Sequence, residues 1–207
     1  MSPEPVAADR AYLLLKTDIL SGRFSPGRAI IERVVAIEYG VSISPIRDAA
    51  QRLVGEHLLE IGTGGGFRVP IATPAAVRDL YSWHDHLVRH LIKVQMPTEL
   101  LTPKPWILRD IVGGEKIARA ATGLFRALAD QAINREHARS LHAANDRLQA
   151  IRLREHLVMD NLDMELQQIT AAINCGSGLN RFSVLRAYHR RRMRRAEKIS
   201  DSLRPLG

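Results

Sequence analysis

The chain has 207 residues, of which 45% are apolar and 25% are charged. This length suits one or two domains, and the composition is typical of a folded globular protein, which excludes a disordered tail, a collagen-like fibre and a repeat array. The first nine residues are polar, and no later stretch approaches about eighteen consecutive apolar residues. We therefore expect a cytoplasmic protein with no membrane partner, in which the lone Cys175 is a buried, reduced thiol.

The charge of the chain is unevenly distributed along it. The formal net charge is +8, which favours a polyanionic partner. Residues 1–70, however, hold eight Lys or Arg and eight Asp or Glu, whereas residues 181–198 hold eight Lys or Arg against only Glu197. Two interpretations of the basic segment stay open. It is either a solvated terminal helix held by a few apolar residues, or a contact for DNA phosphates or an anionic effector.

The first elements in chain order are two predicted helices. Apolar residues at helical spacing predict a helix over residues 9–21, which Gly22 ends. A Pro-Gly turn at 24–27 and a short apolar stretch at 29–31 follow. A second helix is predicted over 32–39, with Gly40 as its C-terminal cap.

A third helix and a hairpin complete this first region. Ser44 before Pro45 predicts an N-terminal cap and a first helical residue, and the apolar stripe from Ile46 to Leu53 continues the helix. Two short strands, 58–61 and 67–69, flank the glycine-rich loop 62–66. Two short helices followed by a hairpin predict a winged helix-turn-helix, a unit that places its second helix in the major groove of DNA.

The rest of the chain is predicted to be helical. Thr73 caps a helix that begins at Pro74 and runs to about residue 95. Prolines at 97, 103 and 105 and a Gly pair at 113–114 interrupt the pattern, which resumes over the ranges 115–130, 134–148, 151–174 and 182–202. The fold class is thus mainly α, with a winged helix-turn-helix domain at 1–72 and an all-helical bundle domain at 73–207.

One ordered set of residues runs through the first region: Tyr12, Ile19 to Gly22, Phe24 to Gly27, Gly40 to Ala49, Leu53 and Gly66 to Val69. With these residues the first region resembles the DNA-binding domain of the GntR family of transcriptional regulators. The helical second half resembles the ligand-binding domain of the FadR-type subfamily, in a divergent form. That resemblance implies a homodimer and a small organic acid as effector.

The resemblance also implies a set of DNA-contacting residues. It places Arg33 on phosphates and base edges and puts Ser44 and Arg47 on the recognition helix, where an arginine can donate two hydrogen bonds to guanine. Many relatives have a basic residue at the position of Ile43, so this chain is expected to make an apolar contact with a thymine methyl there. The complete predicted set is Arg33, Ser42, Ile43, Ser44, Arg47, Asp48, Gln51, Arg52, Gly64 and Gly65, with Arg68 as a further phosphate contact. For Arg52, solvation and a phosphate contact are both open.

The effector site is less well defined. Against the FadR-type pattern we assign His84, Asp130, Asn134, His137 and His189. His86 and His90 have the i, i+4 spacing of a metal-chelating pair, but the sequence offers no third ligand nearby. Asn134 stands where metal-binding relatives have a histidine. We therefore predict neither a metal nor a cofactor.

The sequence shows no catalytic motif, because a nucleophile elbow and a phosphate-binding glycine loop before a helix are both missing. We therefore expect not an enzyme but a homodimeric regulator, activator or repressor, that binds palindromic double-stranded DNA. The alternative is a winged helix that serves as a protein-interaction module without binding DNA.

Overall fold

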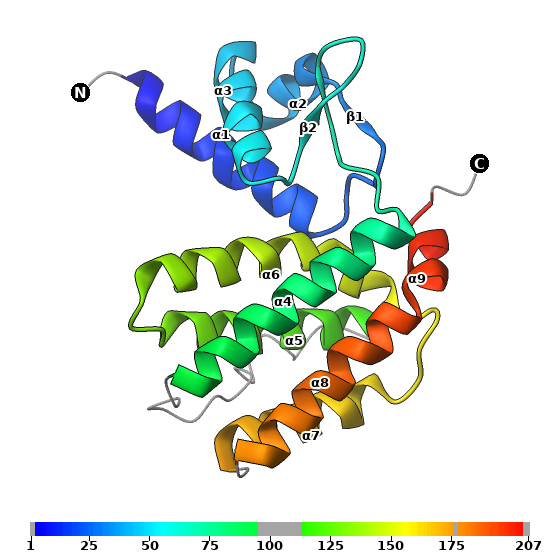
Figure 1. The fold of residues 1–207 in the computed structure, drawn as a ribbon. Coiled ribbons are helices and arrows are strands. Elements are labelled where there is room, and N and C mark those ends of the chain that lie inside the picture. Colours follow the sequence, from blue (N-terminus) through cyan, green and yellow to red (C-terminus); the bar gives the residue numbers. More distant parts are fainter. Residues whose placement is uncertain (1–2, 95–112, 176–177, 205–207) are drawn as a thin grey trace. The chain divides into compact units, whose positions relative to one another are not determined.

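A computed structural model describes residues 3–94, 113–175 and 178–204. The chain forms two compact units that divide between Ala72 and Thr73. Figure 1 shows helices and a small sheet in the first unit and helices in the second. Within the described ranges, every helix is too short or too polar to cross a lipid bilayer. The predicted fold class, mainly helical with an N-terminal winged helix-turn-helix, is confirmed.

The first unit places three helices beside a three-stranded antiparallel sheet. Its elements are α1 (Pro3–Leu20), β1 (Ala29–Ile30), α2 (Glu32–Tyr39), α3 (Ile43–Gly55), β2 (Glu60–Ile61) and β3 (Phe67–Arg68). The strand order is β1-β3-β2, and Phe67 lies opposite Ile30 on one side and Ile61 on the other. The β2–β3 hairpin was predicted, but the pairing of β1 with β3 was not, because residues so far apart in sequence leave no local pattern.

The helix-turn-helix differs from the prediction at one boundary. Gly40 caps α2 in the left-handed conformation, with a φ of 65°, as predicted. Helix α3, however, begins at Ile43 after Ser42, two residues earlier than the prediction that used Ser44 and Pro45. Pro45 is consequently the third helical residue. It is tolerated there because N–H groups in the first turn have no partner within the helix.

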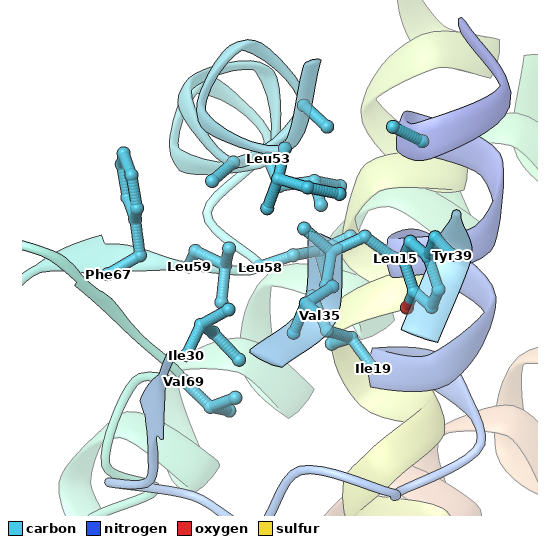
Figure 2. Packing of buried hydrophobic residues seen from close by; sticks show 14 of the residues in the cluster. Leu15, Ile19, Ile30, Val35, Tyr39, Leu53, Leu58, Leu59, Phe67 and Val69 are labelled. Atoms are coloured by element: carbon cyan, nitrogen blue, oxygen red, sulfur yellow. The ribbon is translucent and has the colours of Figure 1, made fainter. Parts of the chain in front are cut away.

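The core of the first unit joins the three helices to β1, β3 and the residues just before β2 (Figure 2). Leu15 of α1, Ile46 and Leu53 of α3 and Leu59 before the hairpin are fully or almost fully buried. Burying one such aliphatic side chain contributes about 1.5–3 kcal/mol of hydrophobic free energy. The polar face of α3 is therefore held outward by the packing of its apolar stripe.

The described part of the second unit consists of helices. They are α4 (Pro74–Val94), α5 (Gly114–Asp130), α6 (Arg135–Glu155), α7 (Leu162–Cys175), α8 (Gly178–Arg194) and α9 (Ala196–Ser202). The Thr73 hydroxyl accepts a hydrogen bond from the Ala76 amide at 3.1 Å, which confirms the predicted cap of α4. The prolines at 97, 103 and 105 lie outside the described residues.

Three predictions for this unit were wrong. The predicted break between residues 148 and 151 is absent, and α6 continues to Glu155 because no Gly or Pro interrupts it. The chain turns later, before Asn161, which has a φ of 55°. The last predicted helix is divided at Arg195 into α8 and α9. Cys175 is exposed rather than buried, because it is the final residue of α7 and its side chain leaves the packed face.

Candidate nucleic-acid interface and a buried polar core

The predicted DNA-contacting residues of the first unit are exposed, except that Arg68, the further phosphate contact, is half-buried and donates to Glu60 at 2.7 Å. Arg33 lies on α2, and Arg47, Asp48, Gln51 and Arg52 lie on the face of α3 opposite its buried stripe. Side chains on this face are free to reach a groove of DNA, since the apolar residues of the same helix face the core.

Arg47 is already oriented by a neighbour on α2. Its Nη2 donates to Oε2 of Glu32 at 2.9 Å, while its side chain is 62% exposed. The ion pair crosses from α3 to α2, so the guanidinium is held at the junction of the two helices. Because exposed ion pairs contribute little free energy, this one can be exchanged for a contact with DNA.

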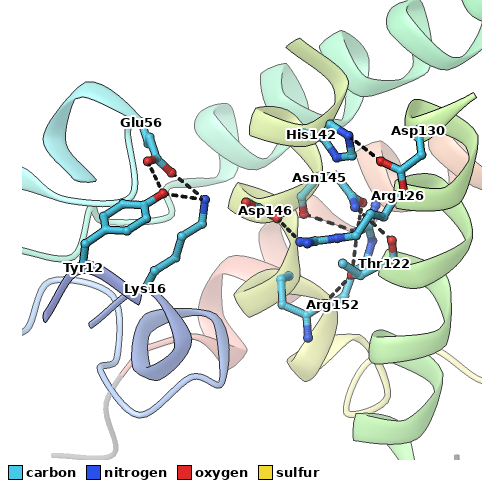
Figure 3. Close-up of polar contacts among 11 residues, drawn as sticks. Tyr12, Lys16, Glu56, Thr122, Arg126, Asp130, His142, Asn145, Asp146 and Arg152 are labelled. Atoms are coloured by element: carbon cyan, nitrogen blue, oxygen red, sulfur yellow. Dashed lines mark hydrogen bonds and ion pairs between the residues drawn. The ribbon is translucent and has the colours of Figure 1, made fainter. Parts of the chain in front are cut away.

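Arg52 is oriented differently, toward α1. Its Nη1 donates to Oδ1 of Asp9 at 2.7 Å, and its guanidinium lies 3.9 Å from the centre of the Tyr12 ring. The Tyr12 hydroxyl in turn donates to Glu56 at 2.6 Å, and Lys16 donates to the same carboxylate at 2.7 Å (Figure 3). These contacts connect α1 to the C-terminal end of α3 and so support the orientation of the recognition helix.

The tip of the hairpin depends on glycine for its backbone conformation. Gly65 and Gly66 have φ values of 82° and 71°, whereas Gly64 has no positive φ. The Gly65 amide donates to the Gly62 carbonyl at 2.9 Å. A side chain at Gly65 would be strained even though the space around it is open, because L residues rarely adopt this conformation.

The predicted effector residues do not come together as one site. His84 and His189 are in contact in the interior of the second unit. Asn134 caps α6 by accepting from the amides of Glu136 and His137, and the ring of His137 bonds the Leu87 carbonyl. The carboxylate of Asp130, an exposed side chain, pairs with His142, a residue outside the predicted set, at 2.9 Å (Figure 3).

The two buried histidines form part of a chain of hydrogen bonds whose direction can be assigned. Nδ1 of His189 lies 2.7 Å from the Leu185 carbonyl, which can only accept, so this nitrogen carries the proton. Burial lowers the pKa of both rings, so each is neutral and Nε2 of His189 accepts from Nδ1 of His84 at 2.8 Å. Nε2 of His84 is then an acceptor that faces Nη2 of Arg152 at 3.4 Å. All four ring nitrogens are engaged, and both imidazoles are neutral.

Arg152 is a buried cation whose contacts are with neutral groups. It is 1% exposed, and Nη1 donates to the Thr122 hydroxyl at 2.9 Å and to Oδ1 of Asn145 at 2.6 Å (Figure 3). Among the described residues, its Nε and the hydroxyl of the buried Tyr188 have no hydrogen-bond partner. An uncompensated charge in an apolar interior is costly, so this centre favours an anion or a water molecule beside Arg152.

A second arginine, Arg192, is buried beside Arg152 but is fully paired. It donates from Nε and Nη2 to the two oxygens of Glu155, both at 2.9 Å, and from Nη1 to Glu165 at 2.8 Å. The Tyr81 hydroxyl also donates to Glu155. Burial raises the pKa of Tyr81 well above its ordinary value, so the phenol keeps its proton. This group was not predicted, because the sequence does not distinguish an inward-facing arginine from its exposed neighbours within a basic run.

The buried core does not have the composition of a metal centre. Among residues 3–94, 113–175 and 178–204, no three His, Cys, Asp or Glu side chains are close enough to hold a metal ion together. The nitrogens of His84 and His189 are already used within the protein, and Arg152 places a positive charge next to them. The donor set therefore does not fit the metal that FadR-type domains can hold.

The buried histidines make the stability of the second unit sensitive to acid. Burial lowers the pKa of His189 to about 3 and that of His84 well below its ordinary value of 6.5. Below about pH 6.5 the unfolded chain binds more protons than the folded chain, so the free energy of unfolding falls as the pH falls toward about 3. Each ring contributes at most about 1.4 kcal/mol per pH unit.

We expect urea unfolding of the whole chain at pH 7, 6 and 5 to show this loss. His189→Gln should remove one titrating ring and make the pH dependence shallower, whereas the exposed His86→Gln should leave the dependence as it is. Equal slopes for His189→Gln and the native chain would contradict the assignment of neutral buried rings.

Comparison with known proteins places the first unit in a family. Residues 7–69 match the model of "Bacterial regulatory proteins, gntR family". A 90-residue segment is 34% identical to the uncharacterized HTH-type transcriptional regulator YdhC of Bacillus subtilis, covering 44% of this chain and 35% of the relative. Over 90 residues the chain is also 30% identical to the HTH-type transcriptional regulator McbR of Escherichia coli, covering 44% and 40%. The matched segments thus span well under half of these relatives.

Solved structures share the fold over nearly the whole chain. The "putative transcriptional regulator GntR from Rhodococcus sp. RHA1" superimposes with a TM-score of 0.71 at 16% identity. The match covers 91% of this chain and 96% of that one. E. coli McbR/YncC superimposes with a TM-score of 0.68 at 16% identity, over 93% and 97%. At this identity the similarity establishes fold alone. Residues 7–69 thus match the gntR family model, and the chain shares the fold of these two solved structures.

Proposed function

We propose that this protein is a sequence-specific DNA-binding transcriptional regulator. The observation that carries the proposal is the exposed face of α3, which a buried apolar stripe holds outward and which bears Arg47. Arg33 is exposed on α2, and the domain matches the gntR family over residues 7–69. Arg47 reads a base edge, Ser42 and Ser44 contact phosphates, and the hairpin tip at Gly65 approaches the minor groove.

Ile43 is proposed to make this operator differ from those of relatives. It is the first residue of α3 and is 43% exposed, so an apolar side chain stands at the end of the helix that enters the groove. An isoleucine offers no hydrogen bond to a base, but it can contact the methyl group of thymine. We expect a thymine at the corresponding operator position.

The regulator is further proposed to act as a homodimer on a palindromic operator, through the helical unit. A twofold protein binds two half-sites related by the same symmetry. The unpaired charge of Arg152 supports a small organic acid as the effector of this unit, because a carboxylate would compensate a buried guanidinium. Such a ligand changes DNA affinity only if it binds two arrangements of the dimer with different affinity.

Selection of bound sequences from a random DNA pool tests the proposal directly. The purified chain should enrich a palindrome, and a fluorescent duplex of that sequence should bind with a strong dependence on salt concentration. The control is a duplex with scrambled half-sites. Failure to enrich any sequence, with the chain shown to be folded by circular dichroism, would contradict DNA recognition and favour the role of a protein-interaction module.

A further inference from the structure

A groove lined by positive charge runs along the second unit between α4 and α8, which lie side by side in Figure 1. Its volume is about 770 Å³. We call it the basic groove. Its lining residues are Arg89, Lys93, Leu179, Phe182, Ser183, Arg186, Ala187, Arg190 and Arg194.

Cations reach the basic groove from both helices, and none of the described residues that line it is acidic. Arg186, Arg190 and Arg194 follow one another at i, i+4 spacing on α8, so their Cα atoms are separated by about 6 Å along the helix axis. Arg89 and Lys93 have the same spacing on α4. Like charges at this spacing repel one another, and a bound anion would relieve the repulsion.

One of these cations has an ionic partner within the described part of the chain. Arg89 pairs with Asp85 at 2.9 Å. Burial raises the pKa of the Asp85 carboxyl, and the charges of Arg89 and Arg186 only partly offset that effect. Across the described ranges, Lys93, Arg190 and Arg194 make no ion pair. Two other arginines of α8 form contacts with neighbouring segments of the same unit. Arg192 binds Glu155 and Glu165, and Arg191 donates to the Asp160 carbonyl.

The dimensions and the lining of the groove indicate the kind of ligand. Small-molecule sites generally occupy about 300–1,000 Å³, and this groove falls within that range. Its α8 wall also carries Leu179, which is 87% exposed, and Phe182 one turn further on. A concave surface with cations on two walls and an apolar patch on one of them suits an anion that also has a planar or apolar part. A DNA duplex, in contrast, presents its phosphates on a convex surface.

We propose that the basic groove binds a small organic polyphosphate of the nucleoside di- or triphosphate class. Its phosphates contact Lys93, Arg190 and Arg194, and its planar part packs on Phe182. The ligand forms charge-assisted hydrogen bonds with the guanidinium groups, which are suited to bidentate contacts with phosphate oxygens. This site is separate from the buried core around Arg152, and its existence does not rest on the proposed DNA binding.

Titration calorimetry of the whole chain with ATP in magnesium-free buffer tests the proposal. We expect saturable binding of one ATP per chain that weakens with added salt, weaker binding of inorganic tripolyphosphate, and no binding of adenosine. Lys93→Gln and Arg190→Gln should each weaken ATP binding at least about tenfold, as expected for loss of a charge-assisted contact. Phe182→Ala should weaken the binding of ATP but not that of tripolyphosphate.

Arg195→Gln is the matched control, because it removes the same charge from the residue next to Arg194 without touching the groove. It should leave ATP affinity within about twofold of the native value.

An equal loss of ATP affinity in Arg195→Gln, or binding that does not saturate, would overturn the proposal in favour of non-specific charge attraction. The proposal is also overturned if ATP does not bind, or if tripolyphosphate binds as tightly as ATP. Loss of operator affinity in Lys93→Gln or Arg190→Gln without any ATP binding would identify the groove as a DNA contact. Because ATP binding is measured without DNA, it can fail or succeed independently of operator recognition.

Discussion

Arg47→Ala is expected to weaken operator binding about 10- to 100-fold. A bidentate arginine contact with guanine contributes about 1–3 kcal/mol of discrimination, and the alanine side chain cannot replace it. The loss should be confined to the preferred operator, so that the affinities for operator and scrambled DNA move closer together. Fluorescence anisotropy with the selected duplex and its scrambled form, at one fixed salt concentration, measures both effects.

Two variants make the Arg47 result specific. Arg78→Ala removes the same charge from an exposed position on α4 of the second unit, and it should leave specificity unchanged. Glu32→Gln removes the carboxylate that holds Arg47 at 2.9 Å and also lowers the negative charge facing DNA, so it should raise DNA affinity by a few-fold. If Arg47→Ala binds operator as well as the native chain, Arg47 is only a solvated residue paired with Glu32.

Arg192→Met is expected to destabilise the protein by about 3–5 kcal/mol, more than any other single change considered above. The variant leaves the Glu155 carboxylate, which is 4% exposed, without its two guanidinium hydrogen bonds. Breaking a buried ion pair by removing one partner costs this much because the remaining charge stays in the interior without compensation. The readout is the midpoint and free energy of urea unfolding, followed by circular dichroism at about pH 7.

The neighbouring Arg191→Met provides the control for this change. Arg191 is one residue away on the same helix, but its side chain is 31% exposed and its distance to Glu165 is 3.5 Å. We expect this variant to lose less than about 1 kcal/mol, as is usual for a partly exposed ion pair. Similar losses in both variants would contradict the view that burial, and not charge alone, makes Arg192 important.

The local features of the first unit could be predicted from sequence because they depend on neighbours in the chain. Gly40 ends α2 in the left-handed conformation, and the stripe from Ile46 to Leu53 defines the buried face of α3 and therefore its exposed face. The hairpin follows from its glycine loop. The start of α3 at Ile43 was missed because Ser42 and Ser44 are both suitable caps, and only the folded backbone distinguishes them.

The helical unit shows where sequence patterns become insufficient. The basic segment 181–198 has cations on every side of a helix, so periodicity alone could not separate buried arginines from exposed ones. The structure turns Arg192 toward Glu155 and Glu165, and it places Arg190 and Lys93 in the lining of the same basic groove. These partners lie tens of residues away or more, and their positions depend on how α4, α6, α7 and α8 pack.

The sequence by itself determined the helical character of this protein, the helix-turn-helix and its exposed arginines, because helix periodicity, capping and glycine turns act over a few residues. Only the tertiary structure decided that His84, Arg152 and His189 form one buried chain of hydrogen bonds and that Asp130 and Asn134 stand apart from it. The physical reason is that burial and charge pairing are properties of contacts between distant segments. The identity of a histidine or an arginine does not specify whether its side chain is exposed to water or buried in the interior of a helical bundle.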